Sequence, residues 1–100
     1  MPVYLIEHEH EEEATACARV VRVFLESGSH YLTHADWGCG DGVHKSWFMI
    51  EAGSKDEARM VLPPTYRNEV SIVELQKWSM ESLDDALRQH IGRGLDSIPR

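Results

Sequence analysis

Positive charge is scarce in this chain of 100 residues. Ten Lys and Arg stand against 17 Asp and Glu, which gives a formal net charge of −7 at pH 7. Nucleic-acid backbones and anionic membranes attract clustered basic side chains, whereas the ten basic residues here are scattered along the chain. We therefore expect neither nucleic acid nor a membrane surface among the partners of this protein.

Cysteines and long apolar runs are also scarce. Cys17 and Cys39 are the two cysteines, so no disulfide framework is expected, and both should be free thiols in a reducing compartment. The apolar run in residues 1–7 is too short for a spanning helix and lacks the basic leader of a signal peptide. These features predict a cytoplasmic protein. The chain has no HExxH and no paired CxxC, so no specific catalytic signature stands out.

The pattern of apolar and turn-forming residues predicts a mixture of helices and strands. β-favouring runs cover residues 3–7, 30–37, 44–52 and 69–75; helical patterns cover residues 12–27, a short stretch from 54, and a stretch from 79 or 82 to about 90. Ser54 and Glu57 form a capping box at the start of the second helix. The pair Pro63-Pro64 ends that helix, because proline cannot continue its hydrogen bonding.

This element order predicts an α+β fold of the ferredoxin-like βαββαβ type. Such a fold has a four-stranded antiparallel sheet in the order 4-1-3-2, with two helices on one face and, here, an extra C-terminal helix. We expect one domain over residues 1–90 and a frayed tail over residues 91–100, where glycine and proline interrupt the helix. The predicted core residues are Leu5, Val21, Leu25, Phe48 and Ile72.

Both faces of the predicted sheet are apolar. In the third strand, Phe48 and Ile50 lie on one face, and Trp47 and Met49 lie on the other. Helices of the same chain would cover one face, and an uncovered apolar sheet face is normally an interface. We therefore expect a homodimer through the open face. The alternative is that the C-terminal helix folds over this face.

Histidines are numerous in the first half of the chain, and the predicted fold brings them to one edge of the sheet. A hairpin centred near Cys39 would place His34 opposite His44, with Cβ atoms about 5 Å apart. The predicted metal ligands are therefore His34, His44, Cys39 and Asp36. Imidazole, thiolate and carboxylate groups together suit nickel or zinc. The alternative is that the two histidines form a hydrogen-bonded cross-strand pair without a metal.

Two other functions fit the same residues. The protein could be a cofactor-independent oxygenase or isomerase acting on a small organic molecule, with His34 or His44 as the general base. In that case Trp37, Trp47 and Tyr66 would line an apolar binding pocket. The protein could also be a structural or interaction dimer without a ligand.

Two short segments resemble known proteins. Residues 1–7 (Met-Pro-Val-Tyr-Leu-Ile-Glu) and 54–59 (Ser-Lys-Asp-Glu-Ala-Arg) are similar to small bacterial ferredoxin-like proteins of unknown function, one branch of which is described as nickel-binding. The element order with an apolar open sheet resembles the dimeric α/β-barrel superfamily, which includes cofactor-free oxygenases and small isomerases. The resemblance implies a dimer and a small-molecule or metal site. Residues 33–45 match neither pattern, so no ligand residue is carried over.

Overall fold

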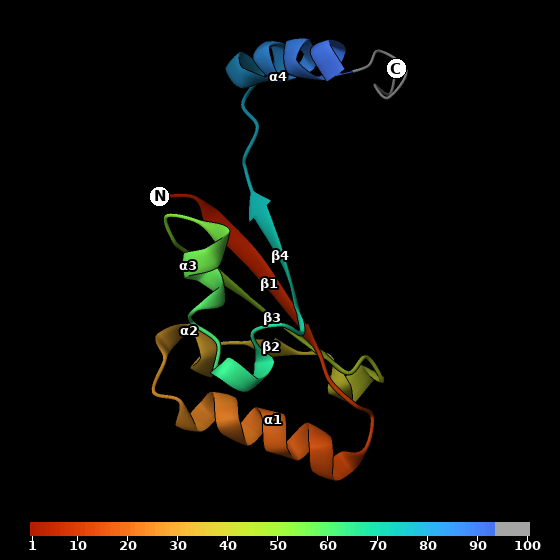
Figure 1. Ribbon diagram of the computed structural model, residues 1–100. Coiled ribbons are helices and arrows are strands. Elements are labelled where there is room, and N and C mark those ends of the chain that lie inside the picture. The colour runs from red at the N-terminus through yellow and green to blue at the C-terminus, as the bar shows by residue number, and fades with distance from the viewer. Residues whose placement is uncertain (94–100) are drawn as a thin grey trace.

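A computed structural model describes residues 1–93 (Figure 1). The strands are β1 (Val3–Glu9), β2 (Asp36–Trp37), β3 (Lys45–Glu51) and β4 (Val70–Leu75), and the α-helices are α1 (Ala14–Glu26), α2 (His30–Thr33), α3 (Lys55–Arg59) and α4 (Met80–Arg93). Two single 3-10 turns cover Cys39–Asp41 and Pro64–Tyr66. The expected α+β class with a four-stranded antiparallel sheet is confirmed, and the ferredoxin-like assignment remains a prediction.

The sheet has the order β2-β3-β1-β4, which reads β4-β1-β3-β2 from its other edge, and all neighbouring strands are antiparallel. β1 lies in the centre, between β3 and β4. Its last residue, Glu9, pairs with Lys45, the first residue of β3. This register places the segment that follows β1 beside the segment that precedes β3, where the candidate site lies.

The predicted second strand, 30–37, is wrong over most of its length. Residues His30–Thr33 form α2, because the Ser29 hydroxyl caps the helix by accepting the backbone N–H of Leu32. The Leu32 side chain is buried in the core. Only Asp36–Trp37 pairs with β3. His34 therefore ends a helix, and the expected position opposite His44 is wrong.

The core lies between one face of the sheet and the helices α1 and α3. Alternate residues of β1 and β3 point into it, as the two-residue period of a strand requires. Phe24 of α1 is fully buried and its ring contacts the rings of Trp37, Phe48 and Tyr66. The buried apolar residues are Tyr4, Ile6, Val20, Phe24, Leu32, Phe48, Ile50, Ala52, Ala58 and Leu62.

The predicted core was only partly correct. Phe48 is buried, and Ile72 packs against the core from β4. Leu5 and Val21 are only partly buried, and Leu25 is 56% exposed, so Leu25 is not a core residue. The predicted inward face of α1 was therefore rotated by one residue.

Capping groups set the starts of α3 and α4. The Ser54 hydroxyl accepts the N–H of Glu57, and the Glu57 carboxylate accepts the N–H of Gly53, which confirms the predicted helix start at Ser54. Ser79 caps α4 by accepting the N–H of Ser82. α4 extends into residues 91–93, the start of the expected tail, and residues 94–100 of that tail lie outside the described part of the chain. Among residues 1–93, no helix has the length and apolar character that crossing a membrane requires.

No element among residues 1–93 covers the sheet face opposite α1 and α3. α4 stands apart from the rest of the fold, beyond the end of β4, and does not fold over this face (Figure 1). Leu5 lies between Met49 and Val73 in the strand register, and these two neighbours are 60% and 49% exposed. An apolar row across three strands is thus open to solvent.

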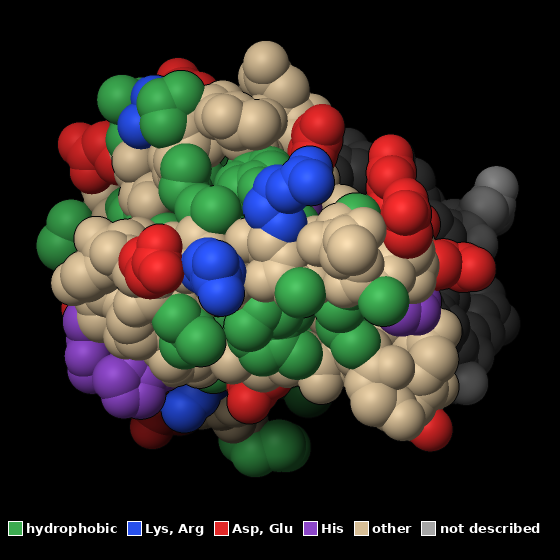
Figure 2. Space-filling view, turned by 90° about the horizontal axis from the view of Figure 1, so that it is seen from below, with side chains coloured by type: hydrophobic (Ala, Val, Ile, Leu, Met, Phe, Trp, Pro, Cys, Tyr) green, Lys and Arg blue, Asp and Glu red, His purple; other side chains and the backbone are tan. Residues whose placement is uncertain are grey.

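The surface seen from the α1 side carries basic side chains only singly, between acidic and hydrophobic ones (Figure 2). A nucleic-acid groove would instead need its Lys and Arg side chains clustered along one face. This surface therefore offers no such groove.

Candidate metal centre

Four potential metal ligands from four different segments meet at one end of the sheet. His10 follows β1, Cys17 lies in the first turns of α1, Cys39 begins the 3-10 turn after β2, and His44 directly precedes β3. One ligand atom from each side chain lies within 4.8 Å of the other three. All four residues are partly buried. Among the described residues, this is the one group of three or more such side chains that could hold a metal ion.

Three of the four ligand atoms are spaced almost as a tetrahedral metal site requires. His10 Nε2 lies 3.3 Å from Cys17 Sγ and 3.1 Å from Cys39 Sγ, and the two sulfur atoms are 3.3 Å apart. A tetrahedral zinc ion with bonds of about 2.3 Å to sulfur and about 2.0 Å to nitrogen separates its ligand atoms by roughly 3.3–3.8 Å. An ion would thus require these three side chains to move apart by only a few tenths of an ångström, and the His44 ligand atom lies within 4.8 Å of each of them.

The two histidines are brought together by the backbone of the central strand pair. The N–H of His10 donates to the carbonyl of His44 at 3.0 Å, which continues the β1–β3 ladder one step beyond Glu9 and Lys45. Directly opposed residues of an antiparallel pair have Cβ atoms about 5 Å apart. The two imidazole rings accordingly lie 5.5 Å apart and perpendicular to each other. His44 therefore has an opposed histidine, but that histidine is His10, directly after β1, and not His34.

Cys39 is held by a tight turn that only glycine permits at two positions. Gly42 has φ +78°, in the left-handed region. A Cβ on Gly38 would lie 2.7 Å from the carbonyl oxygen of Val43 and 3.0 Å from the Trp47 ring. The N–H groups of Gly42 and Val43 donate to the carbonyls of Cys39 and Gly38. The turn therefore presents Cys39 toward Cys17, whose thiol donates to the Cys39 sulfur.

Burial sets the protonation of the cluster. It lowers the pKa of His10, and the neighbouring His44 and His8 lower it further. Burial also raises the pKa of Cys39, with a further contribution from the hydrogen bond to Cys17. At neutral pH His10 is therefore a neutral imidazole that can bind a metal directly, whereas Cys39 is a thiol that must first lose its proton.

Two of the four sequence-predicted ligands belong to this cluster, and two do not. Cys39 and His44 are members. His34 is exposed; its Nδ1 lies 2.8 Å from the carbonyl oxygen of His30, and its ring lies 4.4 Å from the His30 ring. Asp36 lies on the edge strand β2, is exposed, and pairs with Trp47 of β3. The expected ligand roles of His34 and Asp36 therefore find no support in their positions.

Sequence reasoning missed His10 and Cys17. Neither His10 nor Cys17 was among the predicted ligands. The signal for His10 was available, because the predicted sheet order already placed the end of the first strand beside the start of the third, and His44 immediately precedes the latter. No sequence signal distinguishes Cys17 from an ordinary core cysteine.

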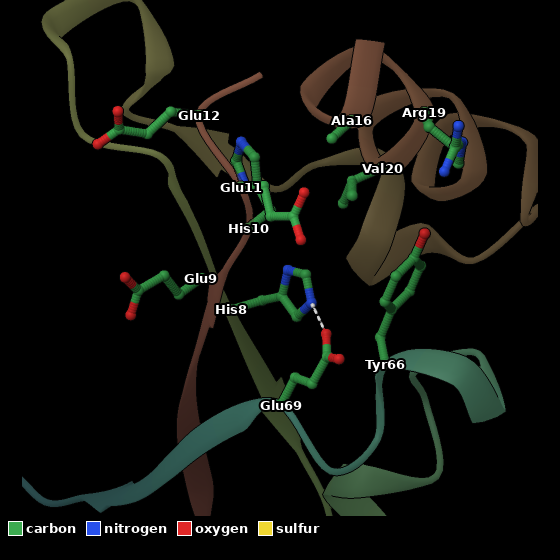
Figure 3. A pocket seen from close by; sticks show the side chains of 10 residues that line it. All are labelled: His8, Glu9, His10, Glu11, Glu12, Ala16, Arg19, Val20, Tyr66 and Glu69. Carbon is green, nitrogen blue, oxygen red and sulfur yellow. Dashed lines mark ion pairs between the residues drawn. The ribbon is translucent and has the colours of Figure 1, made fainter. Parts of the chain in front are cut away.

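A pocket of about 660 Å³ lies beside the cluster and shares His10 with it (Figure 3). Of the three predicted pocket residues, only Tyr66 lines it. The Trp37 ring packs against His10 and Phe24, and the Trp47 indole donates to Glu7 on the strand face that points away from the core. Neither His34 nor His44, the two predicted general bases, lines the pocket.

His8 is the histidine at the bottom of this pocket, and its side chain is 1% exposed. Burial lowers its pKa, while the carboxylate of Glu69, 3.6 Å from Nε2, partly opposes that shift.

The chain matches no protein-family model, no curated protein and no solved structure. What the protein binds must therefore be inferred from the chemistry of the cluster and the pocket.

Proposed function

We propose that the protein binds one transition-metal ion through His10, Cys17, Cys39 and His44. The convergence of their four ligand atoms within 4.8 Å carries this proposal. Two thiolates and two imidazoles suit zinc, and nickel is the second candidate. Calcium and magnesium are disfavoured, because these ions prefer shells of oxygen ligands.

The ligand number favours a structural, storage or sensing role for the ion. Four protein ligands complete a tetrahedral zinc shell, whereas catalytic zinc sites keep one position for water or substrate. Two thiolates also neutralise the charge of a divalent ion. The ion would connect the end of β1, the start of α1, the 3-10 turn after β2 and the start of β3.

Metal analysis of the untagged protein tests this proposal. We expect about one zinc or nickel ion per chain, by analogy with structural four-ligand sites. The double variant Cys17→Ser/Cys39→Ser should lose the ion, while His34→Ala should retain it. The absence of bound metal after purification, together with no heat of binding when zinc or nickel is added, would contradict the proposal.

We also propose that two copies pair through the open sheet face and that the fold is of the ferredoxin-like class. The exposed row formed by Met49, Leu5 and Val73 supports pairing, because apolar rows of this kind usually lie in interfaces. The second copy is the natural occupant, since the chain's own α4 stands away from the face (Figure 1). The strand order and the placement of α1 and α3 on one face support the fold class.

A further inference from the structure

The pocket beside the metal centre contains a buried polar side chain that lacks a partner. The His8 ring points into the pocket (Figure 3), and its side chain is 1% exposed. Within residues 1–93, neither of its ring nitrogens has a hydrogen-bond partner. Its nearest charged neighbour is Glu69, whose carboxylate oxygen lies 3.6 Å from Nε2, beyond hydrogen-bond distance. Buried polar groups without partners are rare and costly, so a ligand that supplied one would be stabilised here.

The charges around the pocket favour a positively charged ligand. Four acidic residues line the pocket, and Arg19 is the one Lys or Arg among its lining residues. The four acids are Glu9, Glu11, Glu12 and Glu69. The carboxylates of Glu11 and Glu69 lie beside His8, whereas those of Glu9 and Glu12 point away from it (Figure 3). A pocket with this balance attracts cations and repels anions.

The size and the walls of the pocket favour an organic cation over a metal ion. Its volume, about 660 Å³, lies in the range of small-molecule sites and far exceeds the space that a single ion needs. Ala16, Val20 and the ring of Tyr66 supply apolar walls. The Tyr66 and His8 rings form a T-shaped pair, with ring centres 5.0 Å apart. The face of an aromatic ring can contact both hydrocarbon groups and a positive charge.

We propose that this pocket binds a small organic amine in its ammonium form. The ammonium group donates hydrogen bonds to a His8 ring nitrogen and to the Glu69 carboxylate, and the hydrocarbon part lies against Tyr66 and Val20. The proposal does not depend on the metal centre, with which the pocket shares only His10. A divalent ion held by two thiolates is neutral as a unit, so metal occupancy leaves the negative charge of the pocket in place.

The test is a titration of the full chain, followed by two-dimensional amide NMR near neutral pH, with benzylammonium as the probe. Benzyl alcohol and benzoate, which have the same ring but a neutral and a negative head group, are the matched ligands. We expect saturable shifts at His8, Tyr66 and Glu69 with benzylammonium. Benzyl alcohol and benzoate should bind at least about tenfold more weakly, because a hydrogen bond between charged groups contributes more than about a factor of ten to the affinity.

Two variants locate the binding. Glu69→Gln keeps the shape of the side chain and removes its charge, so affinity for benzylammonium should fall by about tenfold or more. Glu81→Gln makes the same change on α4, outside the pocket, and should leave the affinity unchanged. His8→Phe should also weaken binding; if it fails to fold, Glu69→Gln alone decides the matter.

Three results would overturn the inference. The first is the absence of saturation by benzylammonium up to roughly 10 mM, where binding is too weak to be specific. The second is equal affinity for benzoate. The third is that zinc shifts the pocket amides in the Cys17→Ser/Cys39→Ser variant, which would make the pocket a metal site. Metal content is measured separately, so failure of amine binding is distinguishable from failure of the metal proposal.

Discussion

Replacing Cys39 with serine should lower by one the number of protons released when the metal binds. The pH dependence of the metal affinity should therefore become weaker. The pKa of Cys39 is raised by burial and by its hydrogen bond to Cys17, so the thiol is protonated throughout the neutral range. A metal ligand must be a thiolate, and binding therefore releases that proton. Each released proton adds about one to the slope of log K against pH, so affinity rises with pH and weakens as pH falls.

His10 provides the contrast that makes the count interpretable. Its pKa is lowered by burial, so above the ordinary histidine range it is already neutral and contributes no proton. Between roughly pH 7 and pH 8, Cys39→Ser should therefore lower the slope by about one, or roughly tenfold per pH unit, in addition to weakening binding overall. Zinc affinity measured by chelator competition at several pH values gives this slope, with His34→Ala as the control that should match the unaltered protein.

A Cys39→Ser protein that binds zinc with an unchanged slope would show that Cys39 is not a ligand. A His34→Ala protein that loses zinc while His10→Ala keeps it would show that the exposed helix-end histidine binds the ion, against the geometry of the cluster.

Three further changes test the packing, the assembly and the redox chemistry. Phe24→Ala should lower the free energy of unfolding by about 3–5 kcal/mol, because Phe24 is fully buried, whereas Leu25→Ala, at a 56% exposed position, should change it by less than about 1 kcal/mol; urea denaturation compares the two. Met49→Lys should split the proposed dimer by placing a charge in its apolar row, and sedimentation that finds only monomers of the unaltered chain at micromolar concentration would refute the dimer. Hydrogen peroxide should join Cys17 to Cys39 in the metal-free protein, since their sulfur atoms are 3.3 Å apart, and block zinc binding; a mass spectrum showing no intramolecular loss of two hydrogens would contradict this.

Local signals in the sequence predicted the parts of the fold that depend on local physics. The strands β1, β3 and β4 alternate or concentrate β-favouring residues, and each was predicted within about two residues. The start of α3 was predictable because Ser54 and Glu57 satisfy backbone N–H groups that any helix start leaves open.

Tertiary packing decided the parts that were predicted wrongly. Residues 30–37 favour strand by composition, but the cap at Ser29 and burial of Leu32 make the first turn helical. In α1, apolar residues occur on adjacent faces, so Val21 and Leu25 were as plausible inward as Val20 and Phe24. The aromatic neighbours of Phe24 come from three other segments, and sequence periodicity carries no information about them.

In the candidate site, too, some positions follow from local sequence and strand order, and others depend on tertiary packing. The sheet order alone brings His10 beside His44, and the glycine-rich turn keeps Cys39 near them. The position of Cys17 depends on how α1 packs beneath the sheet, which its own spacing does not determine. The candidate metal centre combines ligands from a strand ladder, a turn and a helix. For this reason only two of its four ligands, Cys39 and His44, were predicted from the sequence.

The candidate metal centre also lies outside the hydrophobic core. The core residues of α1, Val20 and Phe24, lie at the middle of the helix and beyond it, and Cys17 lies before them, close to exposed positions at the helix start. The turn that carries Cys39 contributes no residue to the core cluster either. An ion held by both cysteines would thus join two segments that contribute no residue to the buried core to the end of the central strand pair. At a free metal concentration of about 100 times Kd, such binding adds about 2.7 kcal/mol to the stability of the fold. The ion would accordingly act as the stabilising element of this end of the sheet, in the place that a larger domain would fill with apolar side chains.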